Sequence, residues 1–108
     1  MRIDLFTLFP AMFESYLQQS ILKRAQAAGL LNVQVHNIRD WAPDKHHVTD
    51  DTPYGGGGGM VMKPEPIFAA VESIVQSPTP SPQPPVPIIL LSPAGRLFNQ
   101  GLAGDLAQ

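Results

Sequence analysis

The sequence predicts an α/β domain built on a parallel sheet. Three segments with the pattern of strands, residues 2–8, 31–38 and 88–91, alternate with segments of helical periodicity. A strand, a helix and a second strand in this order predict a right-handed parallel crossover. Ligands of such sheets bind beyond the carboxyl ends of the strands, so a site is expected in the loops that follow them.

The first half of the chain supplies two of these strands and one helix. Residues 2–8 are mostly apolar, as in a strand buried in a parallel sheet. Apolar residues then recur at helical spacing from Pro10, which suits a first helical turn, to Gly29, which suits a helix stop. Residues 31–38 alternate between apolar and polar side chains and form the second predicted strand.

The second half of the chain is less regular. Residues 39–63 show no periodicity and are predicted to form a long loop, a kind of segment that often carries function. A helix is predicted over 64–75, followed by a proline-rich linker over 77–87 that no helix or sheet interior would accept. The continuous apolar run 88–91 is the third predicted strand, and a helical pattern begins near Asn99.

Composition narrows the class of protein. A chain of 108 residues suits one domain, and its net charge of −2 gives no basic field to attract nucleic acid. Any contact with RNA therefore needs a local patch or a further part of the protein. The absence of cysteine excludes disulfides, thiolate metal sites and cysteine nucleophiles. Without a signal-peptide pattern or an apolar run of about 20 residues, we expect a cytoplasmic protein with no membrane partner.

Five consecutive glycines, residues 55–59, are the most unusual feature of the long loop. Glycine is costly to order, so the tract is either a flexible linker or a place where the backbone must come close to something. Phosphate-loop motifs do not fit, because the tract runs into Met60 and lacks the lysine and hydroxyl residue of a Walker loop. Its flanks, residues 53–54 and 60–62, look packed, which favours an ordered loop.

Two histidines and two aspartates precede the glycines, at His46, His47, Asp50 and Asp51. Imidazole and carboxylate ligands suit several divalent metals, but this spacing matches no helical ligand pair, so no metal site is predicted. A carboxylate here could instead accept a hydrogen bond from the amino group of an unstacked base, as in the recognition of single-stranded RNA.

The segment that follows the third predicted strand is read as a turn at the ligand-binding edge of the sheet. Residues 92–95 offer backbone groups, which suit a neutral or cationic adenosyl group better than a triphosphate. Ser92 lacks the pattern of a nucleophile elbow, so no nucleophile is predicted.

Three stretches together resemble one family. They are "LFTLFPAMF", "AAGLLNVQVHNIRDWAPDKHHVTDDTPYGGGGGMVMKPEP" and "ILLSPAGRLFNQGLAGDLA". They resemble the N-terminal half of the bacterial tRNA (guanine-N1)-methyltransferases of the TrmD family, and the resemblance covers all but the proline-rich linker. This sequence departs from the family pattern with Thr49 inserted after Val48, with Gly58 where proline is common, and with Ala94 where glutamine is common.

The resemblance implies a parallel-sheet methyltransferase of the SPOUT, or α/β-knot, class that works as a homodimer. Members transfer a methyl group from S-adenosylmethionine to N1 of guanine at tRNA position 37, which is 3′ of the anticodon. The family takes its catalytic base and the rest of its trefoil knot from residues beyond Gln108. We therefore expect a fragment, cut before the knot is complete, with weak or no cofactor binding and no catalysis of its own.

Site residues follow from the resemblance position by position. The first cofactor loop is matched by Leu90, Leu91, Ser92, Pro93 and Gly95. The wall of the guanine and cofactor pocket is matched by Asp50, Pro53, Tyr54, Gly55, Gly56, Gly57, Gly58 and Gly59. Arg24 and the region of Lys45 and His46 are candidates for contact with RNA phosphate. The alternative, a non-catalytic small-ligand or protein-interaction module that uses the glycine-rich loop, stays open.

Overall fold

The structure, a computed structural model, describes residues 1–76 and 86–108. The chain forms two compact units, Met1–Ser77 and Pro78–Gln108, and each is described by itself. Most of the predicted proline-rich linker lies outside the described residues.

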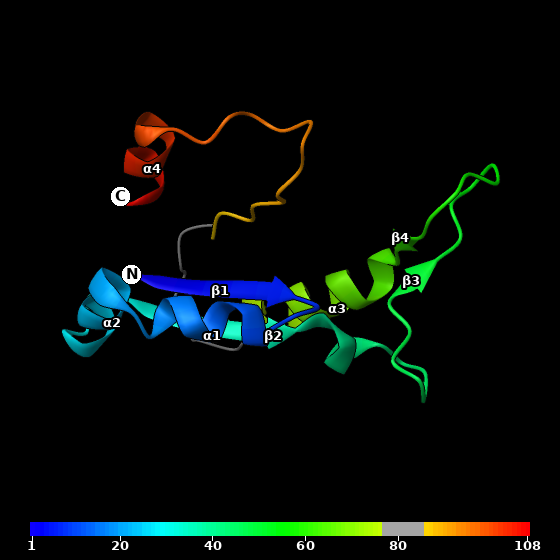
Figure 1. The fold of residues 1–108 in the computed structure, drawn as a ribbon, viewed down its shortest axis with the longest axis horizontal. Coiled ribbons are helices and arrows are strands. Elements are labelled where there is room, and N and C mark those ends of the chain that lie inside the picture. The colour runs from blue at the N-terminus through cyan, green and yellow to red at the C-terminus, as the bar shows by residue number, and fades with distance from the viewer. Residues whose placement is uncertain (77–85) are drawn as a thin grey trace. The chain divides into compact units, whose positions relative to one another are not determined.

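A parallel pair of strands forms the centre of the first unit. Strands β1 (Arg2–Thr7) and β2 (Asn32–Asn37) pair in register from Arg2 with Asn32 to Thr7 with Asn37 (Figure 1). The amino group of Met1 donates to the carbonyl of Leu30 at 2.9 Å, which ties the start of β1 to the residues before β2. Both predicted strands and their parallel pairing are confirmed.

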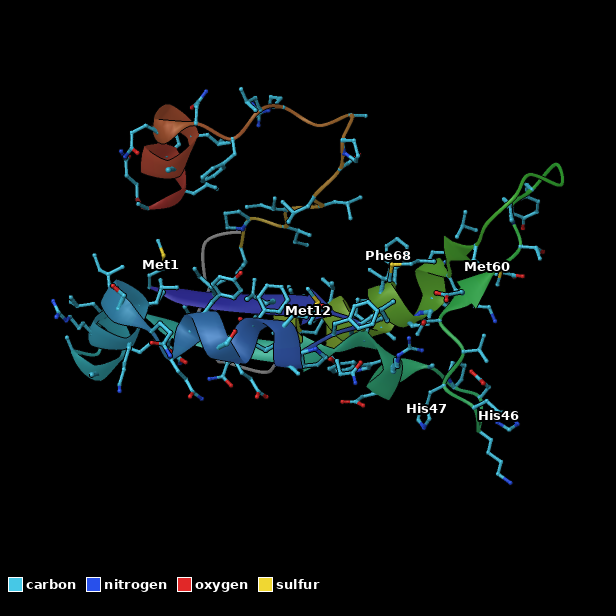
Figure 2. All side chains as sticks on the ribbon, viewed as in Figure 1. Met1, Met12, His46, His47, Met60 and Phe68 are labelled. Carbon is cyan, nitrogen blue, oxygen red and sulfur yellow. The ribbon has the colours of Figure 1, made fainter. Side chains whose placement is uncertain are left out.

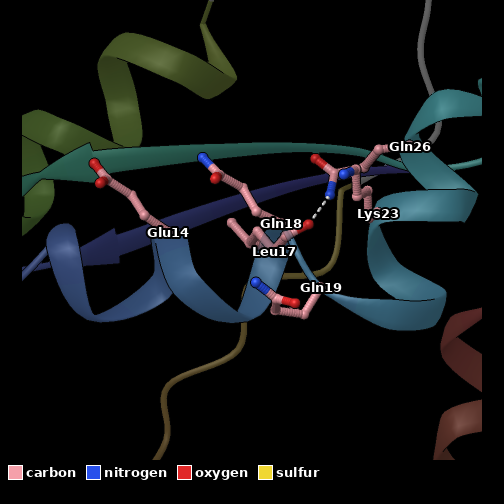
Figure 3. Close-up of a pocket in the computed structure, with 6 residues that line it drawn as sticks. All are labelled: Glu14, Leu17, Gln18, Gln19, Lys23 and Gln26. Carbon is pink, nitrogen blue, oxygen red and sulfur yellow. Dashed lines mark hydrogen bonds between the residues drawn. The ribbon is translucent and has the colours of Figure 1, made fainter.

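The connection between β1 and β2 holds two helices where one was expected. Helix α1 (Ala11–Leu17) ends before α2 (Ser20–Ala27), and Ser20 has a left-handed φ of 45° at the break. The amide nitrogen of Gln26 donates to the carbonyls of Leu17 at 2.7 Å and Leu22 at 3.2 Å, so it bridges the break (Figure 3). The single predicted helix is therefore wrong, because the apolar spacing continues through a backbone break.

The predicted stop at Gly29 is confirmed. Gly29 has a φ of 70°, and its N–H donates to the carbonyl of Gln26 while that of Leu30 donates to Ala25. These two bonds form a Schellman motif, which satisfies carbonyls that the end of α2 leaves without helical partners.

The long loop predicted over 39–63 contains three short elements. A 3₁₀ helix, η1 (Ile38–Trp41), follows β2 directly, and the side chain of Asn37 caps it by accepting from the N–H of Arg39. Strands β3 (Asp50–Asp51) and β4 (Val61–Met62) then form an antiparallel hairpin. Two-residue strands are too short to show a periodicity, so the sequence could not predict them.

Helix α3 (Pro64–Val75) has the predicted bounds and packs against η1. Pro66 lies in its first turn and is buried together with Ala70, while Ile38 and Ala42 are buried at η1 and directly after it. This small cluster fixes η1, and with it the start of the long loop, to α3.

The second unit confirms one prediction and contradicts another. Helix α4 (Gln100–Leu106) is present, and Asn99 caps it by accepting from the N–H of Leu102 at 3.0 Å. The predicted strand 88–91 does not form. Among the described residues β1 and β2 pair only with each other, and Leu90 and Leu91 are 83% and 90% exposed. Within the described residues no strand pairs with this run, so its apolar character alone was insufficient to predict a strand.

In the parts of the chain that can be described, every helix is too short or too polar to cross a bilayer.

Candidate functional site

The predicted pocket residues of the first unit lie on one hairpin. Strand β3 pairs through Asp50 with Met62 and through Asp51 with Val61, and residues 52–60 form the loop between the strands (Figure 1). The N–H of Lys63 donates to the carbonyl of Thr49 at 2.7 Å and extends this pairing by one bond. Thr49, directly before β3, is only 1% exposed. The base of the loop is thus anchored by a buried side chain.

The glycines differ in what they do for the backbone. Gly55, Gly56 and Gly59 have φ values of 91°, 74° and 94°, in the left-handed region that favours glycine, and Gly57 and Gly58 do not. A side chain at Gly57 would come no nearer than 3.9 Å to Pro53, and one at Gly58 would meet nothing within 4 Å. Three of the five glycines are therefore required by backbone conformation, and none by close packing within the described chain.

The flanks of the tract are exposed, which corrects the expectation that they are packed. Tyr54 is fully exposed, and Met60, Val61 and Met62 are each more than two-fifths exposed. The loop projects away from the rest of its unit, and Met60 lies near its base, directly before β4 (Figure 2). These apolar side chains have nothing to cover them within the described residues of this unit.

The two adjacent carboxylates have different surroundings. Asp50 is half-buried, and its Oδ1 accepts one long hydrogen bond of 3.4 Å from the hydroxyl of Thr49. Asp51 is exposed, and its Oδ1 accepts from the N–H of Thr52 at 2.8 Å inside its own loop. Asp50 is the better placed of the two to accept hydrogen bonds from a ligand.

The segment before the hairpin is organised by Asp44. Its carboxylate accepts from the N–H groups of Val48, at 3.0 and 3.1 Å, and of His46 at 3.1 Å. The bond from Val48 contributes most to lowering the pKa of Asp44 below its ordinary value, and it outweighs the opposing effect of desolvation. The ring Nδ1 of His47 lies 2.8 Å from the carbonyl of Arg39, so the segment is fastened to η1.

His46 is considered both for contact with RNA phosphate and as a possible metal ligand. Lys45 and His46 are exposed, as is Arg24 on α2, so all three are accessible. Figure 2 shows His46 and His47 pointing outward from the chain, well apart from Met60. Over residues 1–76 and 86–108, no three His, Asp or Glu side chains gather as metal ligands. The metal alternative receives no support from this arrangement.

The predicted cofactor residues form a turn in the second unit. The N–H of Gly95 donates to the carbonyl of Ser92 at 3.0 Å, and the N–H of Ala94 donates to the Ser92 hydroxyl at 3.2 Å. A Cβ at Gly95 would lie 3.1 Å from the Ser92 carbonyl oxygen, a tight contact that the turn would have to shift to relieve. A shallow hollow lies beside the turn, lined by Leu91, Ser92, Pro93, Gly95, Arg96, Leu97 and Phe98.

A second hollow was missed by sequence reasoning. It lies at the break between α1 and α2, and its lining is mostly amide and charged groups (Figure 3): Glu14, Leu17, Gln18, Gln19, Lys23 and Gln26. The signal available in the sequence was the clustering of glutamines at 18, 19 and 26 around a break that the helical spacing hides.

A half-buried polar pair was also missed. His36 on β2 lies beside Asp4 on β1, with 2.9 Å between Nε2 and Oδ1. The alternation of the two strands, once their register is known, places both side chains on the same face of the pair. The sequence gives the alternation but not the register.

A parallel strand pair joined by helices, followed by a glycine-rich hairpin loop and a separate glycine-containing turn, defines an α/β domain with two loops suited to ligands. The sequence model described as "tRNA (Guanine-1)-methyltransferase TrmD" matches residues 1–108. The chain belongs to this family of tRNA (guanine-1)-methyltransferases.

Individual relatives agree with this membership. A tRNA (guanine-N(1)-)-methyltransferase of Dehalococcoides mccartyi is 55% identical over 108 residues, which are 99% of this chain and 42% of the relative. One of Thermomicrobium roseum is 56% identical over 107 residues, which are 99% of this chain and 38% of the relative. The chain therefore spans about two-fifths of the length of these relatives.

A solved structure supports the fold. The crystal structure of tRNA (m1G37) methyltransferase from Aquifex aeolicus matches with a TM-score of 0.83 at 34% identity, and covers 98% of this chain and 45% of that chain. The predicted fold class, an α/β methyltransferase of the SPOUT class with a parallel sheet, is confirmed by this likeness.

Proposed function

We propose that the protein to which this chain belongs transfers a methyl group from S-adenosylmethionine to N1 of guanine at tRNA position 37. The observation that carries this proposal is the family match over the whole chain, which includes both the glycine-rich hairpin and the Ser92–Gly95 turn. The relative of known structure is named a tRNA (m1G37) methyltransferase. The protein at the length of its relatives is called the full-length protein below.

Asp50 is proposed to bind the edge of the target base. The amino group of guanine is a donor, and a half-buried carboxylate with spare acceptor capacity suits it. The long bond from Thr49 orients this carboxylate and leaves most of its acceptor capacity unused. The glycine loop, from Gly55 to Gly59, would then form the wall of the pocket, and the left-handed backbone at three of its glycines would set the shape of that wall.

The Ser92–Gly95 turn is proposed to hold the cofactor. Its hollow offers exposed apolar side chains, backbone groups and one charged side chain, Arg96, and this set fits an adenosyl group and the carboxylate of a methionine moiety. When bound, the cofactor supplies a sulfonium methyl group. N1 of guanine forms the new bond to carbon, the sulfur keeps the electron pair of the broken bond, and the N1 proton passes to a base that no residue described above supplies.

The finer parts of the proposal concern assembly and location. We infer a cytoplasmic homodimer with a knotted cofactor site, as the family resemblance implies. The exposed Tyr54, Met60 and Met62 support a covered loop in the assembled protein, because apolar side chains of this size are usually buried. Arg24 and Lys45 are exposed cations that suit contact with tRNA phosphate.

Methyl transfer tests the proposal directly. The full-length protein is incubated with labelled S-adenosylmethionine and one of two tRNA transcripts, which carry guanine or adenine at position 37. We expect incorporation into the guanine transcript alone, and none by residues 1–108 on their own. A folded full-length protein that methylates neither transcript would sink the proposal and favour an interaction module that uses the glycine loop.

A further inference from the structure

Asp4 and His36 form a half-buried polar pair between β1 and β2. The His36 side chain is 17% exposed and that of Asp4 is 19% exposed, and Nε2 lies 2.9 Å from Oδ1. Arg2 also binds this carboxylate, with Nε 2.9 Å from Oδ2 and Nη2 3.0 Å from Oδ1. Oδ1 therefore lies within hydrogen-bond distance of both Arg2 and His36, and the pair joins β1 to β2 through their side chains as well as their backbones.

Aromatic rings enclose His36 from two further directions. Its ring stacks on Phe6, its partner in the strand register, with 5.0 Å between centroids and 24° between planes. The ring of Trp41, the last residue of η1, meets it edge-on with centroids 6.1 Å apart and an angle of 68°. His36 is thus the residue at which β1, β2 and η1 meet.

Helix η1 leads directly into the loop that carries the proposed pocket. Trp41 is followed by buried Ala42 and then by the segment that ends in the hairpin at Asp50. The carbonyl of Arg39 in η1 lies 2.8 Å from the ring Nδ1 of His47, which fastens the far part of that segment to the same helix. A change in the position of η1 would therefore be passed to the loop from both ends of residues 42–47.

We propose that His36, held in place by Asp4, is a positioning residue that sets η1 and so fixes the pocket loop for methyl transfer. The bond to Asp4 selects one orientation of the imidazole, and the two rings transmit that orientation to the strand ends and to η1. The effect of His36 on catalysis rests on the proposed function. The effect of His36 on the position of the loop does not depend on that function.

Two variants separate positioning from simple packing. His36→Phe keeps an aromatic ring between Phe6 and Trp41 but cannot bind the carboxylate. Asp4→Asn keeps an oxygen of the same size but removes the charge that binds Arg2 and His36. If His36 only fills space, the first variant is tolerated; if it acts through Asp4, both variants and their combination give the same defect.

Hydrogen exchange of the full-length protein measures this defect. We expect each variant to exchange the amides of residues 42–63 about tenfold faster, with the double variant no faster than either. Helix α1 should be unchanged. Gln34→Ala is the control, because Gln34 lies on the same strand and face, opposite Asp4 in the register, and its side chain donates to Asn32 at 2.8 Å and to no part of the Asp4–His36 pair within the described residues. The proposal is overturned if exchange is unchanged in the Asp4→Asn protein, or if the effects of the two substitutions add in the double variant. If His36→Phe does not fold, exchange in the Asp4→Asn protein alone tests the proposal.

Acid supplies a second readout. Partial burial raises the pKa of Asp4, but the hydrogen bonds and charges of Arg2 and His36 outweigh this and hold the pKa below its ordinary value. A lowered pKa stabilises the fold above the ordinary carboxyl range, and this contribution is lost as pH falls through the folded value. Protection of 42–63 in the unmodified protein should therefore begin to fall below about pH 4, and should reach that of Asp4→Asn only below the lowered pKa of Asp4. A constant difference between the two proteins at all pH values would contradict the role of the charge.

Kinetics then connect the loop to the reaction. Both variants should lower kcat/KM for methyl transfer about tenfold, while Gln34→Ala leaves it unchanged. If the unmodified protein transfers no methyl group, the proposed function fails, and the exchange experiment still decides whether Asp4 and His36 fix the loop. Faster exchange with unchanged kcat/KM would overturn the link between loop position and catalysis.

Discussion

Replacing Gly59 with alanine is expected to lower kcat/KM of the full-length protein about a hundredfold. Gly59 has a φ of 94°, and an L-residue in left-handed backbone costs roughly 1–2 kcal/mol. The loop can avoid this strain only by moving. A pocket wall displaced by about 1 Å is enough to cost two orders of magnitude in rate.

Gly58→Ala is the matched control for this prediction. Neither glycine has an atom within 4 Å of the position that a side chain would take, so the added volume is equally harmless at both. Gly58 lacks the left-handed φ, and alanine there is expected to leave kcat/KM within about threefold of the unmodified protein and to reduce the entropy of the unfolded chain. Steady-state methyl transfer with the guanine transcript measures both variants. Equal losses at 58 and 59 would show that the loop tolerates no side chain at all, contrary to the conformational argument.

Asp50→Asn is expected to lower kcat/KM for the guanine transcript by about 10- to 100-fold, because a bidentate contact to a base edge contributes roughly 1–3 kcal/mol of discrimination. The amide keeps the size of the carboxylate but turns one acceptor into a donor, which opposes the donor groups of guanine. The hydroxyl of Thr49 can still donate to the remaining oxygen, so the hairpin itself should stay intact.

Asp51→Asn provides the comparison for Asp50. The exposed Asp51 uses Oδ1 to accept from Thr52, and asparagine retains that oxygen. We expect its kcat/KM to stay within about twofold of the unmodified value, since exposed polar substitutions seldom disturb the fold. The assignment of base recognition to Asp50 fails if both variants lose activity equally, or if only Asp51→Asn does.

The parts of the fold that the sequence predicted are those with a pattern long enough to be distinctive. Strands 2–8 and 31–38 have the apolar runs and alternation of a parallel pair, and the helix over 64–75 has a proline in its first turn as well as its periodicity. Each signal extends over at least six residues. Their positions were therefore recovered to within one or two residues.

The failures have local physical reasons. Ser20 adopts a left-handed φ in the middle of a continuous apolar spacing, so no pattern marked the break between α1 and α2. Strands β3 and β4 have two residues each, which is below any detectable period. The run 88–91 is apolar enough for a strand, but a strand also needs a neighbour, and sequence composition does not identify one.

The candidate site depended on resemblance more than on pattern. Residue types alone left the glycine tract open between a linker and a binding loop. The structure distinguishes the glycines by backbone conformation, with left-handed φ at 55, 56 and 59 only, and no sequence rule separates these from 57 and 58. The contrast between Asp50 and Asp51 likewise depends on burial and on Thr49, which the alternation of so short a strand could not predict.

The central claim is that the hairpin loop receives the target guanine while the Ser92–Gly95 turn receives the cofactor. Hydrogen exchange of the full-length protein, with S-adenosylhomocysteine and then with the guanine-37 tRNA added, tests it most directly. We expect S-adenosylhomocysteine to slow exchange at residues 88–98 and to leave exchange in α1 unchanged. We expect tRNA to slow exchange at residues 46–60. If both ligands bind but the exchange rates of residues 46–60 and 88–98 do not change, the assignment of these two loops is wrong.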